Sequence, residues 1–243
     1  MAFSRDSDQP KSVVERWASN PGPAAIFDFN GTLSDDEPIL FRIFTELFQT
    51  HLDWSMSVDY YNRHLLGHSD REIIEKVLAT TAHPASEVEP LLELRKHRYR
   101  ELVAGDNPIQ PATVELVRAL ADHGVPIGIV TGAQRDDVDA VLRSSPVGDW
   151  ISVIVTEEDV AHGKPDPEGF LSGAAQLGCR PQSTLVFEDS LPGVRGARAA
   201  GMWCIAVGDR PSVEIRATAQ AVVPVLSAQI IDHVLPLLVS NRA

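Results

Sequence analysis

Asp28 comes directly after a short apolar run. Asn30, two residues later, comes directly before a glycine, Gly31. The run, residues 23–27, has the pattern of a buried strand. Open α/β sheets place ligand-binding groups at the carboxyl ends of such strands. A carboxylate at that place can attack phosphorus and form an aspartyl-phosphate, which splits a hydrolysis into two easier displacements. By itself the segment favours a plain turn, because Asn-Gly is above all a turn signal.

Three further segments carry polar residues at the end of an apolar strand or in a stiff loop. They are residues 127–132, which end in Thr131 and Gly132, residues 163–167, in which Lys164 precedes a proline, and residues 184–190, which contain Glu188 and Asp189. The prolines of the second segment stiffen its loop, which favours a placed lysine. Paired carboxylates suit Mg²⁺, which prefers hard oxygen ligands, and without a cation they repel each other.

In chain order, Asp28, Thr131, Lys164 and the Glu188-Asp189 pair resemble the four motifs of the haloacid dehalogenase-like hydrolase superfamily. The similarity covers nearly the whole chain and is greatest to the branch of phosphatases and β-phosphoglucomutases. It implies that Asp28 is the nucleophile and that Lys164 offsets negative charge on Asp28 and on the phosphoryl oxygens. It also implies a Mg²⁺ site formed by Asp28, the backbone carbonyl of Asn30 and Asp189, with Glu188 either a further ligand or the neighbour of one. The phosphate site that it implies is formed by Gly31, Thr32, Thr131, Gly132 and Lys164.

Asn30 is the point at which the chain departs from the family pattern. Family phosphatases and mutases generally carry Asp here, which protonates the leaving oxygen and then activates the water that cleaves the aspartyl-phosphate. An amide cannot do this general acid–base work, which is typically worth about 10²–10⁴-fold in rate. Four explanations stay open: a slower phosphatase or one for good leaving groups, a substitute base at Asp35, Asp36 or His68, a protein that binds a phosphorylated ligand with little turnover, and an engineered replacement of Asp by Asn.

Residues 65–71 resemble the loop of a helical cap that sets substrate specificity in this family. Within it, His68 and Arg71 are the candidates for contact with the substrate. An equally good interpretation is a helix N-terminus, with Ser69 as the N-cap and Glu72 closing a capping box.

The remaining pattern predicts the elements that hold these residues. Between residues 35 and 105 apolar residues recur at helical spacing without a strand pattern, which is typical of an inserted helical domain. From residue 106 on, helices and strands alternate, which predicts βαβ crossovers and a parallel sheet. The predicted strands are residues 24–29, 126–130, 151–155, 184–187, 203–207 and 221–225, and the predicted helices are residues 112–123, 135–143, 168–177, 193–200 and 228–239.

The predicted fold class is α/β: a Rossmann-like, doubly wound, mainly parallel sheet with an inserted all-helical cap. We expect an N-terminal tail over residues 1–22 with one short helix at 12–17, a catalytic core over residues 23–34 and 106–243, and the cap over residues 35–105. The resemblance implies that the cap closes over the site.

Composition narrows the possible partners. Lys and Arg number 21 against 34 Asp and Glu, and the resulting net charge of -13 repels nucleic-acid phosphates and anionic membranes. Cys179 and Cys204 lack a metal-binding spacing, and the first twenty residues lack the apolar region of a signal peptide. We therefore expect a cytoplasmic protein, a monomer or weak homodimer, that binds neither nucleic acid nor membranes.

The leading hypothesis is a Mg²⁺-dependent phosphomonoester hydrolase that acts on a small phosphorylated metabolite. A β-phosphoglucomutase-like enzyme is the first alternative, although Asp70 stands where mutase-like members carry a basic residue. A catalytically impaired protein that binds a phosphorylated ligand is the alternative outside the enzymes, and Asn30 is the feature in its favour.

Two other reactions are known in the same superfamily. A phosphonoacetaldehyde-type hydrolase fits Asn30, but it needs a Schiff-base lysine from the cap, and the cap lysines Lys76 and Lys96 lie outside the specificity loop. A dehalogenase does not need the metal-binding carboxylates, so the presence of Glu188 and Asp189 argues against one.

Overall fold

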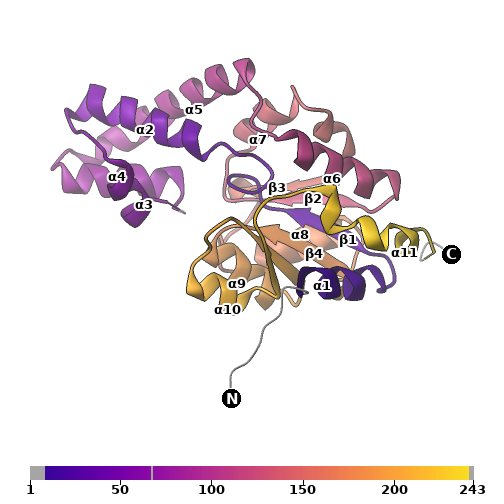
Figure 1. Cartoon of the computed structure of the whole chain (residues 1–243). Helices are drawn as coiled ribbons and strands as arrows, with labels where there is room; N and C mark the ends of the chain where they lie inside the picture. The colour runs from indigo at the N-terminus through magenta and orange to yellow at the C-terminus, as the bar shows by residue number, and fades with distance from the viewer. Residues whose placement is uncertain (1–8, 67, 241–243) are drawn as a thin grey trace.

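Six strands form one parallel sheet in the part of the chain that the computed structural model describes, residues 9–66 and 68–240 (Figure 1). The strand order is β3-β2-β1-β4-β5-β6, and every neighbouring pair is parallel. The strands are β1 Ala24–Phe27, β2 Ile127–Val130, β3 Val153–Val155, β4 Thr184–Glu188, β5 Trp203–Val207 and β6 Ala221–Val223. This arrangement confirms the predicted doubly wound α/β sheet.

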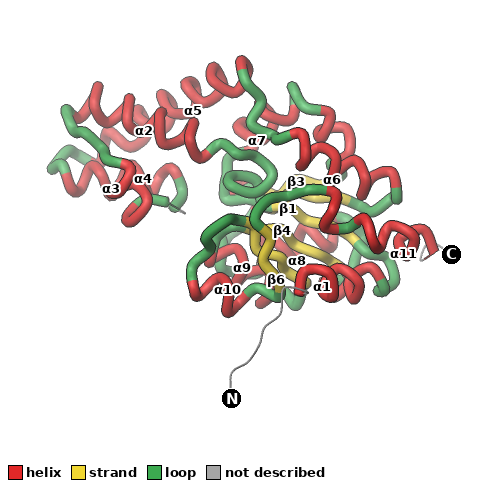
Figure 2. Tube along the Cα trace, in the orientation of Figure 1, coloured by secondary structure: helices red, strands yellow, loops and turns green. Residues whose placement is uncertain are grey.

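Helices cover both faces of the sheet. In chain order, the helices of the described residues are α1 Gln9–Ala18, α2 Glu37–Leu52, α3 Val58–His64, α4 Asp70–Thr80, α5 Val88–Gly105, α6 Pro111–Asp122, α7 Arg135–Leu142, α8 Glu168–Gln176, α9 Leu191–Ala199, α10 Val213–Thr218 and α11 Leu235–Ser240. Side chains of α1, α6, α7 and α11 enter the core on one face, and side chains of α8, α9 and α10 enter the core on the other. Figure 2 shows the strands as a central layer with helices around it.

The strands are apolar on both sides, as expected where helices cover both faces of a sheet. Successive side chains of a strand point to opposite faces. Phe27 and Phe187 therefore enter one core, where their rings stack with centroids 4.9 Å apart, while Ile26 and Val186 enter the other.

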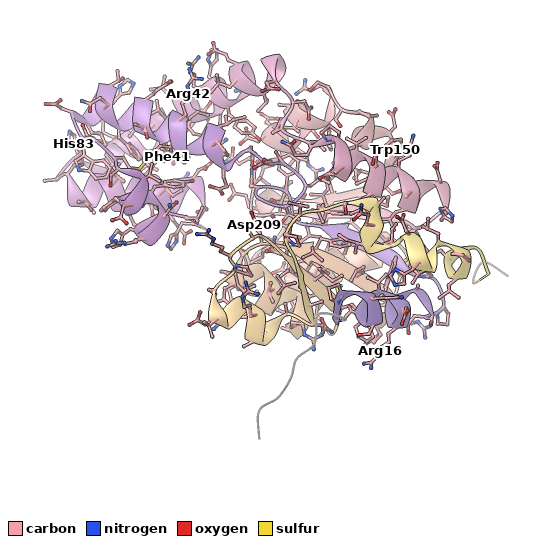
Figure 3. All side chains as sticks on the ribbon, viewed as in Figure 1. Arg16, Phe41, Arg42, His83, Trp150 and Asp209 are labelled. Atoms are coloured by element: carbon pink, nitrogen blue, oxygen red, sulfur yellow. The ribbon has the colours of Figure 1, made fainter. Side chains whose placement is uncertain are left out.

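The chain between β1 and β2 is helical, as predicted, and runs through α2 to α6. Helices α2 to α5, called the helical lobe below, pack around a core of their own that includes Phe44 and Leu91. Helix α6 instead packs on the sheet through Leu116. Figure 1 shows the helical lobe to one side of the sheet, and Figure 3 labels Phe41 within the lobe and Trp150 on the sheet side.

The segment before β1 belongs to the core, which corrects the expectation of a tail with a short helix at 12–17. Helix α1 is longer than predicted, and Trp17 on it is fully buried. The indole N–H of Trp17 donates to the carbonyl oxygens of Ala24 and Ser183, each at 3.0 Å, so the polar end of a buried aromatic ring is satisfied. Residues 1–8 of the predicted tail lie outside the described residues.

The end of the chain also differs from the prediction. The single helix expected at 228–239 is wrong: the structure has two short 3₁₀ helices, Ala228–Ile230 and Asp232–Val234, and then α11. Pro236 explains the break, because proline cannot donate within a helix and is tolerated only in its first turn, so α11 begins at Leu235.

Helix α10 was not predicted. It begins at Ser212, whose side chain accepts a hydrogen bond from the backbone N–H of Ile215, a local cap that apolar periodicity does not reveal. None of the helices in residues 9–66 and 68–240 combines the length and apolar character that a bilayer crossing requires.

Candidate active site

Two carboxylates meet where β1 and β4 end, at the same edge of the sheet. The strands pair in parallel with Phe27 opposite Phe187, so the residues that follow, Asp28 and Glu188, are neighbours. The backbone N–H of Asp28 donates to the carbonyl of Phe187 at 2.9 Å. Parallel pairing thus brings together two polar positions that are far apart in the chain, as open α/β sheets do at their carboxyl edge.

Lys164 lies between these two carboxylates. Its ammonium Nζ donates to Oδ1 of Asp28 and, at 2.7 Å, to Oε1 of Glu188. Burial raises the pKa of Asp28 to about 7, against the opposing charge of Lys164, and the charge of Glu188 adds to the rise. Burial alone would lower the pKa of Lys164, but the charges of Asp28 and Glu188 outweigh it and raise that pKa above its ordinary value, so the side chain is a cation.

Asp189 completes the acidic group and is positioned by the turn after β1. The hydroxyl of Thr32 donates to Oδ1 of Asp189 at 3.1 Å. Gly31 has φ +76°, and a Cβ at this position would lie 2.5 Å from Oδ2 of Asp189. The turn therefore requires glycine both for its left-handed backbone and for the close approach of the carboxylate.

The carboxylates of Asp28, Glu188 and Asp189 could hold a metal ion, because one ligand atom of each lies within 4.8 Å of the others. Glu188 is the least available of the three to bind a cation, because both of its oxygens accept hydrogen bonds. Oε2 accepts from the N–H and the hydroxyl of Ser190 (2.7 and 2.9 Å), and Oε1 accepts from Lys164. Burial raises the pKa of Asp189 well above its ordinary value, and the charges of Glu188 and Asp28 add to the rise. A divalent cation would relieve this repulsion, so hard oxygen donors and an excess of negative charge both fit Mg²⁺.

The predicted phosphate-binding pair, Thr131 and Gly132, follows β2 beside this group. Thr131 is buried, its N–H donates to the carbonyl of Val155 at 2.9 Å, and its hydroxyl oxygen accepts from the N–H of Ala133 at 3.0 Å. Both members of the pair line the cavity described next. Because its oxygen already accepts a hydrogen bond, the hydroxyl of Thr131 is placed to donate to an anion.

A cavity of about 970 Å³ lies between this edge of the sheet and the helical lobe. Asp28, Asn30, Lys164 and Asp189 line its sheet side, and Glu37, Tyr61, His68, Asp70 and Arg95 line its lobe side. The volume suits a small-molecule ligand. On the lobe side the hydroxyl of Tyr61 donates to Oε2 of Glu37 at 3.0 Å, and burial raises the pKa of Glu37 to about 7.

Asn30 is bound to a buried carboxylate. Its amide Nδ2 donates to Oδ2 of Asp36 at 2.7 Å, and the hydroxyl of Tyr99 on α5 donates to the same oxygen. Burial raises the pKa of Asp36 in spite of these hydrogen bonds. Of the substitute bases suggested by the sequence, Asp36 is fully buried and Asp35 is exposed, and neither is among the described residues that line the cavity.

The two predicted specificity residues are placed differently. His68 lines the cavity. Arg71 is not among the described lining residues, since its guanidinium is exposed and pairs with Glu89 on α5 at 2.8 Å. The structure therefore brings His68 to the site and directs Arg71 away from it.

The local structure around His68 is the predicted helix N-terminus. Ser69 and Glu72 form the capping box that begins α4, while Gly67 lies outside the described residues. Among the residues that the structure places, neither Lys76 nor Lys96 lines the cavity.

Arg95 is a site residue that the sequence reasoning missed. It is only 2% exposed, its Nε lies 2.9 Å from Oδ2 of Asp70, and Nη1 donates to Asp137 on α7. Its guanidinium also lies over the ring of Tyr99, 4.7 Å from the centroid. A usable signal was its spacing of four from both Leu91 and Tyr99, which places an arginine on the apolar face of a helix.

Comparisons with known proteins show the family to which the chain is similar. The model of a family described as haloacid dehalogenase-like hydrolase matches residues 25–207. The chain is 33% identical to protein CbbY of Rhodobacter capsulatus over 186 residues, which cover 74% of this chain and 82% of that one. It is 29% identical to validoxylamine A 7'-phosphate phosphatase of Streptomyces hygroscopicus subsp. limoneus over 218 residues, which cover 87% of this chain and 98% of the relative.

Among solved structures, the chain is similar to CbbY from Rhodobacter sphaeroides in complex with phosphate. The TM-score is 0.72 at 26% identity, over 84% of this chain and 94% of that chain. A mutant of the same protein has been solved in complex with xylulose-(1,5)bisphosphate.

Proposed function

The chain belongs to the haloacid dehalogenase-like hydrolase family, and from this premise we propose that it hydrolyses a small phosphorylated metabolite with Asp28 as the nucleophile and Mg²⁺ as the cofactor. The observation that carries the proposal is the placement of Lys164 between Asp28 and Glu188 on the sheet side of the cavity. One similar protein is named a validoxylamine A 7'-phosphate phosphatase, and another has been solved in complex with xylulose-(1,5)bisphosphate. Both support a phosphorylated sugar or a related metabolite as the substrate class.

In the first step Asp28 attacks phosphorus. Lys164 holds Oδ1 of Asp28, which leaves Oδ2 for the attack. The new bond joins Oδ2 to phosphorus, the ester bond to phosphorus breaks, and the leaving oxygen departs with its electron pair. Lys164 and the hydroxyl of Thr131 stabilise the negative charge of the phosphoryl oxygens.

Asp28, Asp189 and the backbone carbonyl of Asn30 would hold the cation, with Glu188 beside them holding Lys164. A bound Mg²⁺ would supply positive charge next to the transferring phosphoryl group. Glu188 contributes indirectly, because both of its oxygens already accept hydrogen bonds from Lys164 and Ser190.

In the second step water attacks the phosphorus of the aspartyl-phosphate. The bond between phosphorus and Asp28 breaks, the carboxylate is regenerated, and the proton lost by the water goes to the released phosphate. Asn30 takes up no proton in this step and delivers none to the leaving oxygen in the first. The first step is therefore fastest for aryl and acyl phosphates, whose anions leave unaided, and slower for alkyl phosphates.

The alternatives fit the site less well. A mutase must move protons in both directions, which the amide of Asn30 cannot do. A phosphonoacetaldehyde-type hydrolase needs a lysine at the substrate carbonyl, and within the described chain Lys76 and Lys96 are not at the cavity wall. A binding protein with little turnover is the second candidate, which Asn30 favours.

Assays of phosphate release from acetyl phosphate and para-nitrophenyl phosphate test the proposal. We expect turnover with Mg²⁺, loss of turnover with EDTA, and recovery with excess Mg²⁺. Asp189→Asn should raise the Mg²⁺ concentration needed for half-maximal activity, whereas Asp122→Asn, an exposed carboxylate at the end of α6, should not. Activity insensitive to EDTA would overturn the metal site. Binding of inorganic phosphate without release of phosphate from any substrate would favour the binding protein.

A further inference from the structure

Asn30 has two polar side-chain atoms, and the structure assigns them different partners. Nδ2 donates to Oδ2 of Asp36 at 2.7 Å. The hydroxyl of Tyr99 donates to the same oxygen, so both neighbours donate to Asp36, and it is the amide nitrogen of Asn30, not its oxygen, that faces Asp36. In the described part of the chain, Oδ1 of Asn30 accepts no hydrogen bond, and Asn30 is a half-buried residue of the cavity wall.

The side chain of Asp36 does not cap helix α2, although its position at the start of that helix suggests that it would. Asp36 is the N-cap residue of α2, where an aspartate ordinarily accepts a hydrogen bond from the first backbone N–H groups of the helix. Here its side chain makes no capping bond to the described backbone of α2. It is instead fully buried between Asn30, in the turn after β1, and Tyr99, on α5 of the helical lobe.

We propose that Asp36 is a positioning residue, which holds Nδ2 of Asn30 so that the amide oxygen Oδ1 faces the cavity and accepts a hydrogen bond from the water that cleaves the aspartyl-phosphate. This inference rests on the proposed function, because it concerns the second step of that reaction. Asn30 then orients the water without taking its proton. The water oxygen bonds to phosphorus, the bond from phosphorus to Asp28 breaks with its electron pair returning to the carboxylate, and the proton passes to the released phosphate.

The same arrangement links the water to the helical lobe. Tyr99 belongs to α5, Asp36 stands at the start of α2, and Asn30 belongs to the sheet edge, so one buried oxygen joins three segments. A loss of either hydrogen bond would let the amide rotate. Displacement of a reacting group by about 1 Å can cost roughly 10²-fold in rate.

The test separates positioning from base catalysis by comparing two substitutions of Asp36. Asp36→Ala removes the acceptor, and should lower kcat for acetyl phosphate by about 10²-fold. KM should fall with kcat, so that kcat/KM, which reports the first step, changes little. The substitution should also increase the fraction of enzyme trapped as the aspartyl-phosphate. Asp36→Asn keeps an acceptor oxygen for Asn30 and Tyr99 and should restore kcat to within a few-fold of the original. If Asp36 were the substitute base, Asp36→Asn would lose as much activity as Asp36→Ala.

Matched controls make the result decisive. Asp122→Ala, at an exposed carboxylate outside the cavity lining, should leave kcat and the trapped fraction unchanged. Tyr99→Phe, which removes only a hydroxyl, should lower kcat several-fold and carries the test if Asp36→Ala does not fold. The proposal is overturned by an unchanged rate of dephosphorylation in folded Asp36→Ala or Tyr99→Phe, or by equal losses in Asp36→Ala and Asp36→Asn. Absence of turnover in the unsubstituted protein would instead reject the proposed function itself.

Discussion

The two sides of the cavity balance their charges in different ways. On the sheet side, one cation, Lys164, lies between Asp28 and Glu188, and Asp189 is held by the neutral hydroxyl of Thr32. The carboxylates there exceed the cations, which leaves a place for a divalent metal ion. This is the side at which we propose that a phosphoryl group binds and is transferred.

On the lobe side, the charges are paired or hydrogen-bonded within the protein itself. Arg95 contacts both Asp70 and Asp137, and Asp36 accepts from the neutral side chains of Asn30 and Tyr99. The buried groups of this side thus join the helical lobe to the sheet. The difference indicates that substitutions on the sheet side should stop chemistry without unfolding the protein, whereas those on the lobe side should alter stability and the rate of individual steps.

The largest effect is expected from the nucleophile on the sheet side. Asp28→Asn should lower turnover by roughly 10⁴-fold, the scale observed when a catalytic carboxylate is lost. The melting temperature should not fall, because burial raises the pKa of Asp28 to about 7 and so disfavours its ionised form in the folded protein. Steady-state assays and thermal unfolding measure the two quantities. Activity like that of the unsubstituted protein would eliminate Asp28 as the nucleophile.

The next largest effect is expected where the two sides meet, at Asn30. Asn30→Asp should raise turnover by about 10²-fold, the lower end of the range for general acid–base groups. The gain is limited because Asp36 would then be a second carboxylate at hydrogen-bond distance, and such a pair shares one proton. The double variant Asn30→Asp with Asp36→Asn keeps one amide and one carboxylate and should gain more.

The substrate dependence of this gain identifies the slow step. Gains that are greatest for alkyl phosphates indicate that protonation of the leaving oxygen limits the rate, and equal gains indicate that hydrolysis of the aspartyl-phosphate does. Unchanged rates in both Asn30 variants would mean that another residue acts as the acid and base. His68, which lines the cavity from the lobe side, would be substituted next.

A stability difference should distinguish buried from exposed charges on the lobe side. Arg95→Met leaves the buried Asp137 and the half-buried Asp70 without their cation and should lower the free energy of unfolding by about 3–5 kcal/mol. Arg71→Met removes an exposed pair with Glu89 and should cost less than about 1 kcal/mol. Denaturation by urea measures both. Equal costs would show that Arg95 does not hold the helical lobe to the sheet.

The smallest effect is a pH dependence at Glu37. Burial raises its pKa from 4.5 to about 7, so as the pH rises through this window the unfolded chain loses the proton first and the folded state is penalised. Glu37→Gln removes this penalty and should raise the melting temperature more at pH 8 than at pH 5. Glu75→Gln, an exposed carboxylate on α4, is the control. A benefit that does not grow with pH would mean that the Glu37 carboxyl is not penalised by burial.

Much of the fold could be predicted because it rests on local pattern. Apolar runs marked the ends of β2 and β4 to within one residue, whereas β1 ends at Phe27, two residues before the predicted end. The polar residues after these strands proved to be neighbours at one edge of the sheet. Ser69 and Glu72 formed the capping box that their spacing predicts. In contrast, the helix predicted at 12–17 proved longer than expected and part of the core. The sequence pattern did not show this, because it depends on the contact of Trp17 with Ser183, which is far away in the chain.

The sequence by itself therefore determined the order of strands and helices and the chemical types at the strand ends, because both depend on residues close together in the chain. Only the tertiary structure decided which side chains contact one another. Arg71 pairs with Glu89, whereas Arg95 lines the cavity. Asp36 makes no capping bond to α2 and accepts a hydrogen bond from Asn30 instead. Local periodicity can place a residue on the buried face of a helix. It does not predict which distant side chain will pair with the buried charge or accept the buried hydrogen bond, because that partner is brought into place by the packing of helix against sheet.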